Sequence, residues 1–246
     1  MEFSKKEIKY ILVAAIIAAF VFSFNEWGIE KFNIATGIKN LFIAFIFCSV
    51  IYFLHSFAQK LVADYYEYRI EFTLIDIKRR VRKIGKIGRA VTIPIGPIIT
   101  LLLVFISAGK FIFLLLNSYE HISQKEFRIG RQWVNLKEFE EAQIALAGPL
   151  SQIVLLIIFK LLLPFSVVFN KAMFITSVIA IYHMLPLPKV DGSKIFFGSR
   201  SLYIASLVFI VTFIILIFHL SVIQTIILAL LFSTILGIMY LYKKTK

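Results

Sequence analysis

Long apolar runs separated by short polar segments dominate the chain. A membrane-spanning α-helix needs about 20 mostly apolar residues. Residues 173–187 form a short run that ends in prolines, and five further runs come close to or exceed the required length. We therefore predict an all-α polytopic membrane protein with about six transmembrane helices, at 8–25, 40–63, 142–163, 173–187, 201–218 and 221–242.

One further apolar run, 91–116, is broken by prolines and glycines and carries Lys110. If it does not span, almost all loop lysines and arginines fall on one side of the membrane. If it spans, the basic residues divide about equally between the two sides. The positive-inside rule favours the first arrangement. We predict a re-entrant insertion at 91–116 and both termini in the cytoplasm.

The segment 69–77 alternates polar and apolar residues with a period of two, which is typical of a half-buried strand. A basic run follows at 78–89. Clusters of this kind next to a membrane attract anionic headgroups. We expect a partly β insertion between the second and third spans, and anionic lipid as a partner of the basic loop 78–89.

Composition supports the membrane class. The chain is 60% hydrophobic and 17% charged, whereas soluble domains have about 25% charged residues. The net charge of +13 resides in the loops, where lipid headgroups are the natural counter-charge, so we expect no nucleic acid partner. Cys48 is the single cysteine, which excludes an internal disulfide and a cysteine-based metal cluster.

The first apolar run follows Lys5, Lys6 and Lys9, as in a secretory signal sequence. However, residues 23–27 lack the small residues of a cleavage site. We expect this segment to remain as an anchor helix.

Three groups of polar residues interrupt the apolar helices, where ionisable groups are costly and often functional. The first is His55 with Gln59, which share one helix face. The second is the segment 145–152, where Gly148 and Pro149 suggest a helix start with close packing. The structural alternatives are hydrogen bonding between helices and tight helix packing.

The third group is the segment 182–192, in which prolines end a helix and return Asp191 to the membrane surface. A carboxylate followed by Gly192 at this place suits a metal ligand. The alternative is an aspartate that caps the next helix.

Together, the helical histidine, an Ala-Gly-Pro-Leu segment and a later Leu-Pro-x-x-x-x-Asp-Gly resemble the site-2 protease family of intramembrane zinc metalloproteases. The resemblance covers about residues 40–200. In the family motif His-Glu-x-x-His, two histidines bind zinc and the glutamate is the general base. The resemblance implies zinc as the cofactor and a transmembrane helix as substrate or partner. It implies zinc ligation by His55 and Asp191, and a substrate cleft at Gly148, Pro149, Gln152, His183 and Pro186.

The chain departs from the family at four positions. Ser56 replaces the catalytic glutamate, and Gln59 replaces the second histidine. Gln152 and His183 stand where the family usually has asparagine. Loss of a general base costs about 10²–10⁴ in rate, so the resemblance implies lost or weakened proteolysis. Because two ligands alone, His55 and Asp191, hold zinc poorly, it also implies weak or absent zinc binding.

Three functions remain open at this stage. The leading one is a site-2-protease-like protein that binds transmembrane helices without efficient cleavage. The second is an active protease whose zinc site is rebuilt from His55, His183 and Asp191, a donor set that zinc favours. The third is a small transporter or channel with the two histidines on its path, although residues 201–242 offer few polar groups. We expect one membrane domain, 1–246, with a 40–200 core and a C-terminal helical hairpin at 201–246.

Overall fold

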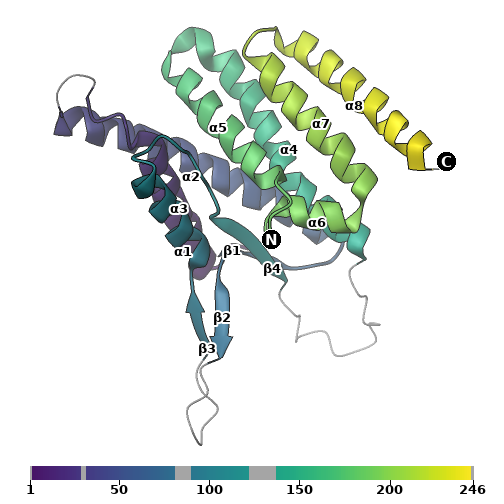
Figure 1. The fold of residues 1–246 in the computed structure, drawn as a ribbon, viewed down its shortest axis with the longest axis horizontal. Coiled ribbons are helices and arrows are strands. Elements are labelled where there is room, and N and C mark those ends of the chain that lie inside the picture. The colour runs from purple at the N-terminus through teal and green to yellow at the C-terminus, as the bar shows by residue number, and fades with distance from the viewer. Residues whose placement is uncertain (1, 29–31, 81–89, 122–136, 245–246) are drawn as a thin grey trace, which may run out of the picture. The chain divides into compact units, whose positions relative to one another are not determined.

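A computed structural model describes residues 2–28, 32–80, 90–121 and 137–244 (Figure 1), and most of them are helical. Short strands occur only between α2 and α4 in the described part of the chain. In chain order the elements are α1 (Lys5–Ser23), α2 (Ile34–Tyr65), β1 (Ile70–Leu74), β2 (Ile77–Arg80), β3 (Ala90–Ile93), α3 (Ile95–Ile106), β4 (Asn117–His121), α4 (Glu138–Leu162), a 3-10 turn (Leu163–Phe165), α5 (Val168–Met184), α6 (Asp191–Gly198), α7 (Arg200–Ile217) and α8 (Val222–Lys244).

Four helices of the described chain are long and apolar enough to cross a membrane: α2, α4 with its 3-10 turn, α7 and α8. This supports an integral membrane protein. Two of the six predicted spans fall short of the same criterion. α1 has several charged residues in its first turns, and α5 is only 17 residues long.

The insertion between α2 and α4 is partly β, as the alternation predicted. β1 covers most of the expected strand, and β2 follows it after two residues. α3 has 12 residues and is about 18 Å long at 1.5 Å per residue. That is less than the roughly 30 Å thickness of a hydrocarbon core, so a helix of this length does not cross the membrane alone.

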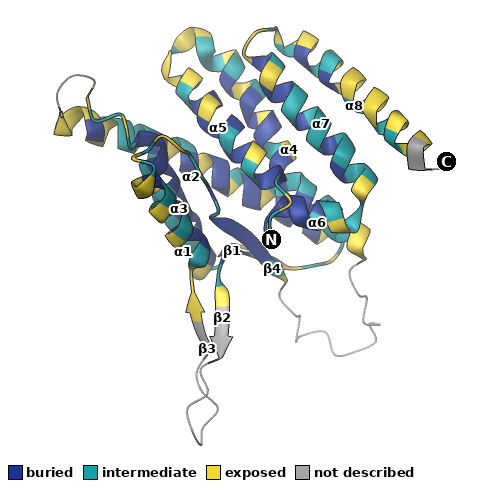
Figure 2. Cartoon of the chain, viewed as in Figure 1, coloured by how far each residue is buried: buried dark blue, intermediate teal, exposed yellow. Residues whose placement is uncertain are grey.

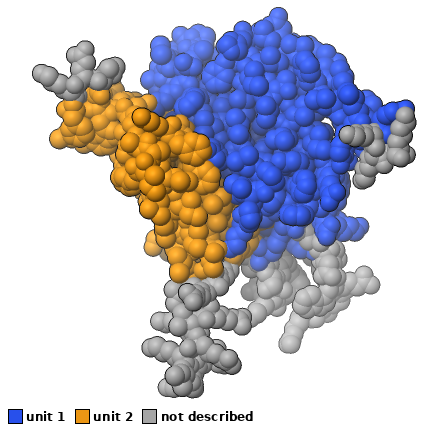
Figure 3. Space-filling view, viewed as in Figure 1, with its two compact units in different colours: residues 1–2, 50–71, 121–246 blue, residues 3–49, 72–120 orange. Residues whose placement is uncertain are grey.

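The chain divides into two compact units, coloured blue and orange in Figure 3. Unit 1 comprises residues 1–2, 50–71 and 121–246. Unit 2 comprises residues 3–49 and 72–120. The boundary therefore falls within α2, so that the first half of this helix belongs to unit 2 and the second half to unit 1.

Unit 2 is built around α1, which packs on α3. Glu7 in the first turn of α1 is almost fully buried, and its carboxylate accepts a hydrogen bond from the backbone N–H of Phe72 at 2.9 Å. Phe20, Phe24 and Phe105 form an aromatic cluster between these helices, with ring centroids 5.5–5.8 Å apart. A buried acidic side chain of α1 thus holds the middle of β1.

β2 and β3 form an antiparallel hairpin in which Ile77 pairs with Ile93 and Arg80 pairs with Ala90. β1 pairs separately with β4. The basic loop predicted to bind anionic lipid, 78–89, lies largely outside the described residues. Only the backbone of its first three positions, in β2, is described.

Unit 1 is a layer of helices in which α4 packs against α5, α6 and α7, and α7 packs against α8. Figure 2 shows dark blue buried positions along α4, α5 and α7, whereas most of α8 is exposed. Large apolar side chains such as Ile223 and Ile238 on α8 are 72% and 67% exposed. Such a surface is unfavourable in water and suits contact with lipid.

One local prediction is wrong. Gly148 and Pro149 do not start a helix, because α4 begins at Glu138 and Pro149 lies well inside it. Acidic residues in the first turn, and the Glu140 carboxylate that accepts a hydrogen bond from the Lys137 backbone N–H at 3.0 Å, explain the earlier start. An internal proline is tolerated in membrane helices because neighbouring groups satisfy the freed carbonyl.

Candidate metal centre

The second half of α2 contributes a buried histidine to unit 1. His55 has no exposed surface, and its ring lies directly against the backbone of Gly148 on α4. A β-carbon at position 148 would stand 2.2 Å from the His55 ring, a distance that no side chain tolerates. The glycine therefore provides the space that the imidazole occupies.

The turn between α5 and α6 brings two more polar residues to the same place. α5 ends at Met184, whose carbonyl oxygen accepts a hydrogen bond from the buried Tyr203 hydroxyl at 3.1 Å. A β-carbon on Gly192 would lie 2.4 Å from the carbonyl oxygens of Met184 and Leu185. The glycine thus permits α6 to begin close to the end of α5, which places Asp191 near His183.

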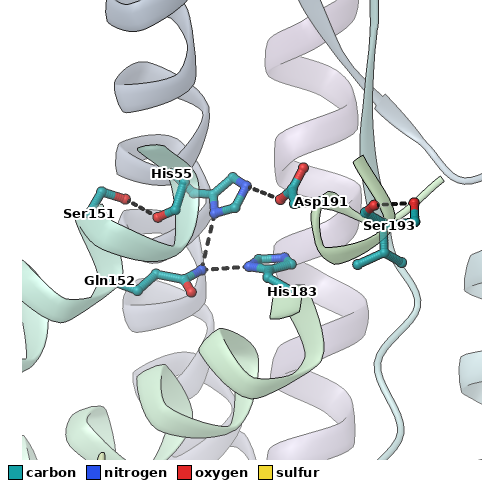
Figure 4. Close-up of polar contacts among 8 residues, drawn as sticks. His55, Ser151, Gln152, His183, Asp191 and Ser193 are labelled. Atoms are coloured by element: carbon teal, nitrogen blue, oxygen red, sulfur yellow. Dashed lines mark hydrogen bonds and ion pairs between the residues drawn. The ribbon is translucent and has the colours of Figure 1, made fainter. Parts of the chain in front are cut away.

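The side chains of His55, His183 and Asp191 meet in unit 1 (Figure 4). The three can each offer one ligand atom, and these atoms lie within 4.8 Å of one another. The two imidazole rings are 4.2 Å apart between centroids. All three residues are at most 4% exposed. No other group of histidine, cysteine or acidic side chains in the described residues reaches this geometry.

The hydrogen bonding of this cluster is incomplete. His55 Nε2 and Asp191 Oδ2 lie 2.9 Å apart, as in an ion pair. Apart from this contact, His55 Nε2 and both Asp191 carboxylate oxygens are buried without a hydrogen-bond partner. Leaving such atoms unpaired is expensive. Two imidazoles and one carboxylate are a donor set that zinc favours, so the cluster could hold a metal ion and the unpaired atoms fit that group.

Gln152 on α4 contacts both histidines. Its Nε2 lies 3.2 Å from His55 Nδ1 and 2.8 Å from His183 Nδ1. Gln152 has no exposed surface, and its Oε1 has no hydrogen-bond partner. A hydrogen bond to one ring nitrogen fixes the orientation of a histidine ring, and here one glutamine amide contacts both rings.

The electrostatics favour an ionised carboxylate. Burial has the largest influence and raises the pKa of Asp191, but His55, followed by His183 and Lys194, together lower it by more, so the resulting pKa lies below the ordinary value. Asp191 is thus an anion at neutral pH. A buried anion is stable only when a cation or hydrogen bonds compensate it, which a metal ion would do.

The remaining predicted site residues do not join the three ligands. Ser56 and Gln59 are buried on α2, and the described contacts connect neither of them to the cluster. Gln59 Nε2 has no hydrogen-bond partner. Pro149 is buried within α4, and Pro186 is exposed between α5 and α6. Of the expected substrate-cleft residues, His183 belongs to the cluster, and Gly148 and Gln152 contact it.

Sequence reasoning missed two contributions to this centre. It did not predict that Gln152 joins both histidines, although Gly148 and Gln152 are four residues apart and share a helix face. It also missed Tyr203 on α7, whose hydroxyl holds the end of α5. No local pattern marks Tyr203, because its partner is a backbone carbonyl of another helix.

Protein-family models, curated proteins and solved structures gave no match when compared with this chain. The described fold supports an integral membrane protein, and the described site is a buried group of two histidines and one aspartate.

Proposed function

We propose that this chain is a site-2-protease-like membrane protein that binds one zinc ion through His55, His183 and Asp191 and has little or no proteolytic activity. The observation that carries the proposal is the convergence of three ligand atoms within 4.8 Å, from three separate elements. It supports the rebuilt donor set suggested by the sequence. Bound zinc would supply Lewis acidity and lower the pKa of a water molecule.

The weak point of this centre as an enzyme is proton transfer. Ser56 replaces the glutamate of the resembling motif, and a serine hydroxyl is a poor base near neutral pH. No carboxylate other than Asp191 joins the cluster in the described residues. Because Asp191 is a proposed ligand, it is unsuited to act as the base as well. The chain's own residues can hold the metal and exclude bulk water, since all three are buried.

The proposed partner is a single transmembrane helix of another membrane protein, bound without efficient cleavage. This part rests on the resemblance of residues 40–200 and on the apolar character of the chain. We also propose six spans, with α1 and α5 inserted together with the four longer helices, both termini in the cytoplasm, and the insertion between α2 and α4 as a re-entrant element. The distribution of lysine and arginine supports this topology.

Metal analysis of the full chain, purified in detergent, tests the zinc site. We expect about one zinc per wild-type chain and almost none after His183→Ala. The matched control is His219→Ala, which removes an exposed histidine outside the cluster and should keep the metal. A wild-type protein without zinc, or zinc retained at full occupancy in His183→Ala, would refute the site.

A reporter with one transmembrane helix tests the reaction. We expect the reporter to co-purify with the protein uncleaved. Cleavage that stops with a chelator and in His55→Ala would instead establish the active protease. Ion flux in liposomes that depends on His55 and His183 would favour a transporter or channel.

A further inference from the structure

The amide group of Gln152 occupies an unusual place, because it faces the Nδ1 atoms of two buried imidazoles at once (Figure 4). A carboxamide NH2 group can donate two hydrogen bonds, and a carboxamide oxygen can accept two. The same side chain can therefore satisfy both rings in either of two orientations, which differ by a 180° rotation of the amide.

The two orientations require different proton positions on the rings. A neutral imidazole carries one proton, on either Nδ1 or Nε2. When the Gln152 NH2 group faces the rings, as in the structure, both Nδ1 atoms must accept and the protons reside on Nε2. The proton of His55 then lies on the atom 2.9 Å from Asp191 Oδ2, where the carboxylate favours it.

A metal ion requires the opposite arrangement. If Nε2 is the ligand atom, its lone pair must be free of a proton, so the proton moves to Nδ1 and becomes a donor. An NH2 group cannot accept a hydrogen bond, whereas the Gln152 oxygen can accept from both Nδ1–H groups. In the present orientation this oxygen is buried and has no partner. Rotation of the amide would give the oxygen two donors and leave the NH2 group without its two acceptors. The tautomer of the two rings therefore decides which orientation of the amide is favoured.

We infer that Gln152 is a positioning residue that sets the tautomer of both histidines together. With its NH2 group toward the rings it stabilises the metal-free, Nε2-protonated pair. With its oxygen toward them it stabilises the Nδ1-protonated pair, whose Nε2 atoms bind the metal. The metal-binding half of this inference rests on the proposed zinc site, and the metal-free half does not.

Nitrogen-15 NMR of histidine-labelled protein tests the inference directly, because protonated and bare ring nitrogens have separate shifts. The chain has four histidines, so a His121→Ala, His219→Ala background leaves only the two rings in question. We expect protons on Nε2 in the metal-free protein and on Nδ1 after zinc is added. Nδ1-protonated rings in the metal-free protein would overturn the inference whether or not zinc binds.

Two variants separate a positioning role from a structural one. Gln152→Met keeps the volume but removes both polar atoms, and it should weaken zinc binding by about 10–100-fold, as loss of such a partner does in other metal sites. Gln152→Glu can only accept, so it should place the protons on Nδ1 even without zinc. Ser177→Ala, which removes a buried hydroxyl on α5 that has no hydrogen-bond partner, is the control and should change neither readout.

The outcomes distinguish the two proposals. Wild-type protein that binds no zinc but carries its ring protons on Nε2, and shifts them in Gln152→Glu, would refute the zinc site and support the role of Gln152. If wild-type protein binds zinc and folded Gln152→Met binds it just as tightly, the zinc site is supported and the role of Gln152 is refuted.

Discussion

Two segments of unit 1 contribute to the buried cluster, and they contribute unequally. The end of α2 has only His55 there, while Ser56 and Gln59 occupy the places of the base and second ligand in the resembling family motif. The other segment contributes His183 from the last turn of α5 and Asp191 from the first residue of α6. In the proposed zinc site, two of the three ligands therefore come from the α5–α6 segment and one from α2. The comparison teaches that metal binding and catalysis can be separated: a donor set can be rebuilt elsewhere, whereas a base must stand beside the reacting water.

The largest expected effect comes from restoring the α2 segment. The double variant Ser56→Glu, Gln59→His gives α2 the carboxylate and the second imidazole of the resembling family motif. A positioned base contributes about 10²–10⁴ in rate, so cleavage of a single-span reporter should become measurable. The matched control, Ser56→Gln with Gln59→His, has the same bulk without a base and should stay inactive. Equal cleavage by both would mean that position 56 does not supply the missing base.

Removing the carboxylate of the turn should have the next largest effect. Asp191→Asn keeps the shape but loses the anion, so zinc affinity should fall by more than the about 10–100-fold typical of losing an outer hydrogen-bond partner. Competition with a chromogenic chelator measures the change. Asp64→Asn near the end of α2 is the control, since this residue is outside the cluster. Unchanged affinity in Asp191→Asn would show that the turn does not provide the ligand.

Replacing the glycine that makes room for the His55 ring should give an intermediate effect. Gly148→Ala places a methyl group in the His55 ring, and overpacking of this kind costs about 1–3 kcal/mol. We expect a lower unfolding temperature and about a tenfold weaker zinc affinity, since 1.4 kcal/mol corresponds to tenfold. Gly237→Ala on α8, where the nearest atom to a β-carbon is 4.0 Å away, should leave both unchanged. A tolerated Gly148→Ala would indicate that His55 lies elsewhere in solution.

The smallest effect concerns the backbone of the turn. Lys189 has a φ of +68°, a left-handed conformation that costs a non-glycine residue roughly 1–2 kcal/mol. Lys189→Gly should therefore stabilise the protein by about 0.5–1 kcal/mol after the entropy of glycine is subtracted. Thermal unfolding in detergent measures the change in stability. Pro188→Gly is the contrast, because residue 188 has no positive φ whose strain glycine would relieve. Destabilisation by Lys189→Gly would indicate that the lysine side chain matters more than the strain.

Much of the fold could be predicted because helices in a membrane depend on local sequence. Apolar length alone marked α2, α4, α7 and α8, and period-two alternation marked β1. The start of α4 was misjudged because Gly148 and Pro149 suggested a boundary, whereas the acidic first turn and the hydrogen bond from the Lys137 N–H to Glu140 decided it. A proline indicates where a helix is weakened, and not whether neighbouring helices compensate for it.

The sequence by itself determined the membrane class, the four long apolar helices and the residue types available for a metal site. Only the tertiary structure decided that His55, His183 and Asp191 meet, that Gln152 joins both rings and that Tyr203 holds the end of α5. The reason is physical. Apolar periodicity is a local property, whereas a cluster of ligands depends on how separate helices pack. It also depends on positions such as Gly148 and Gly192, where only the packed neighbours show that a side chain would not fit.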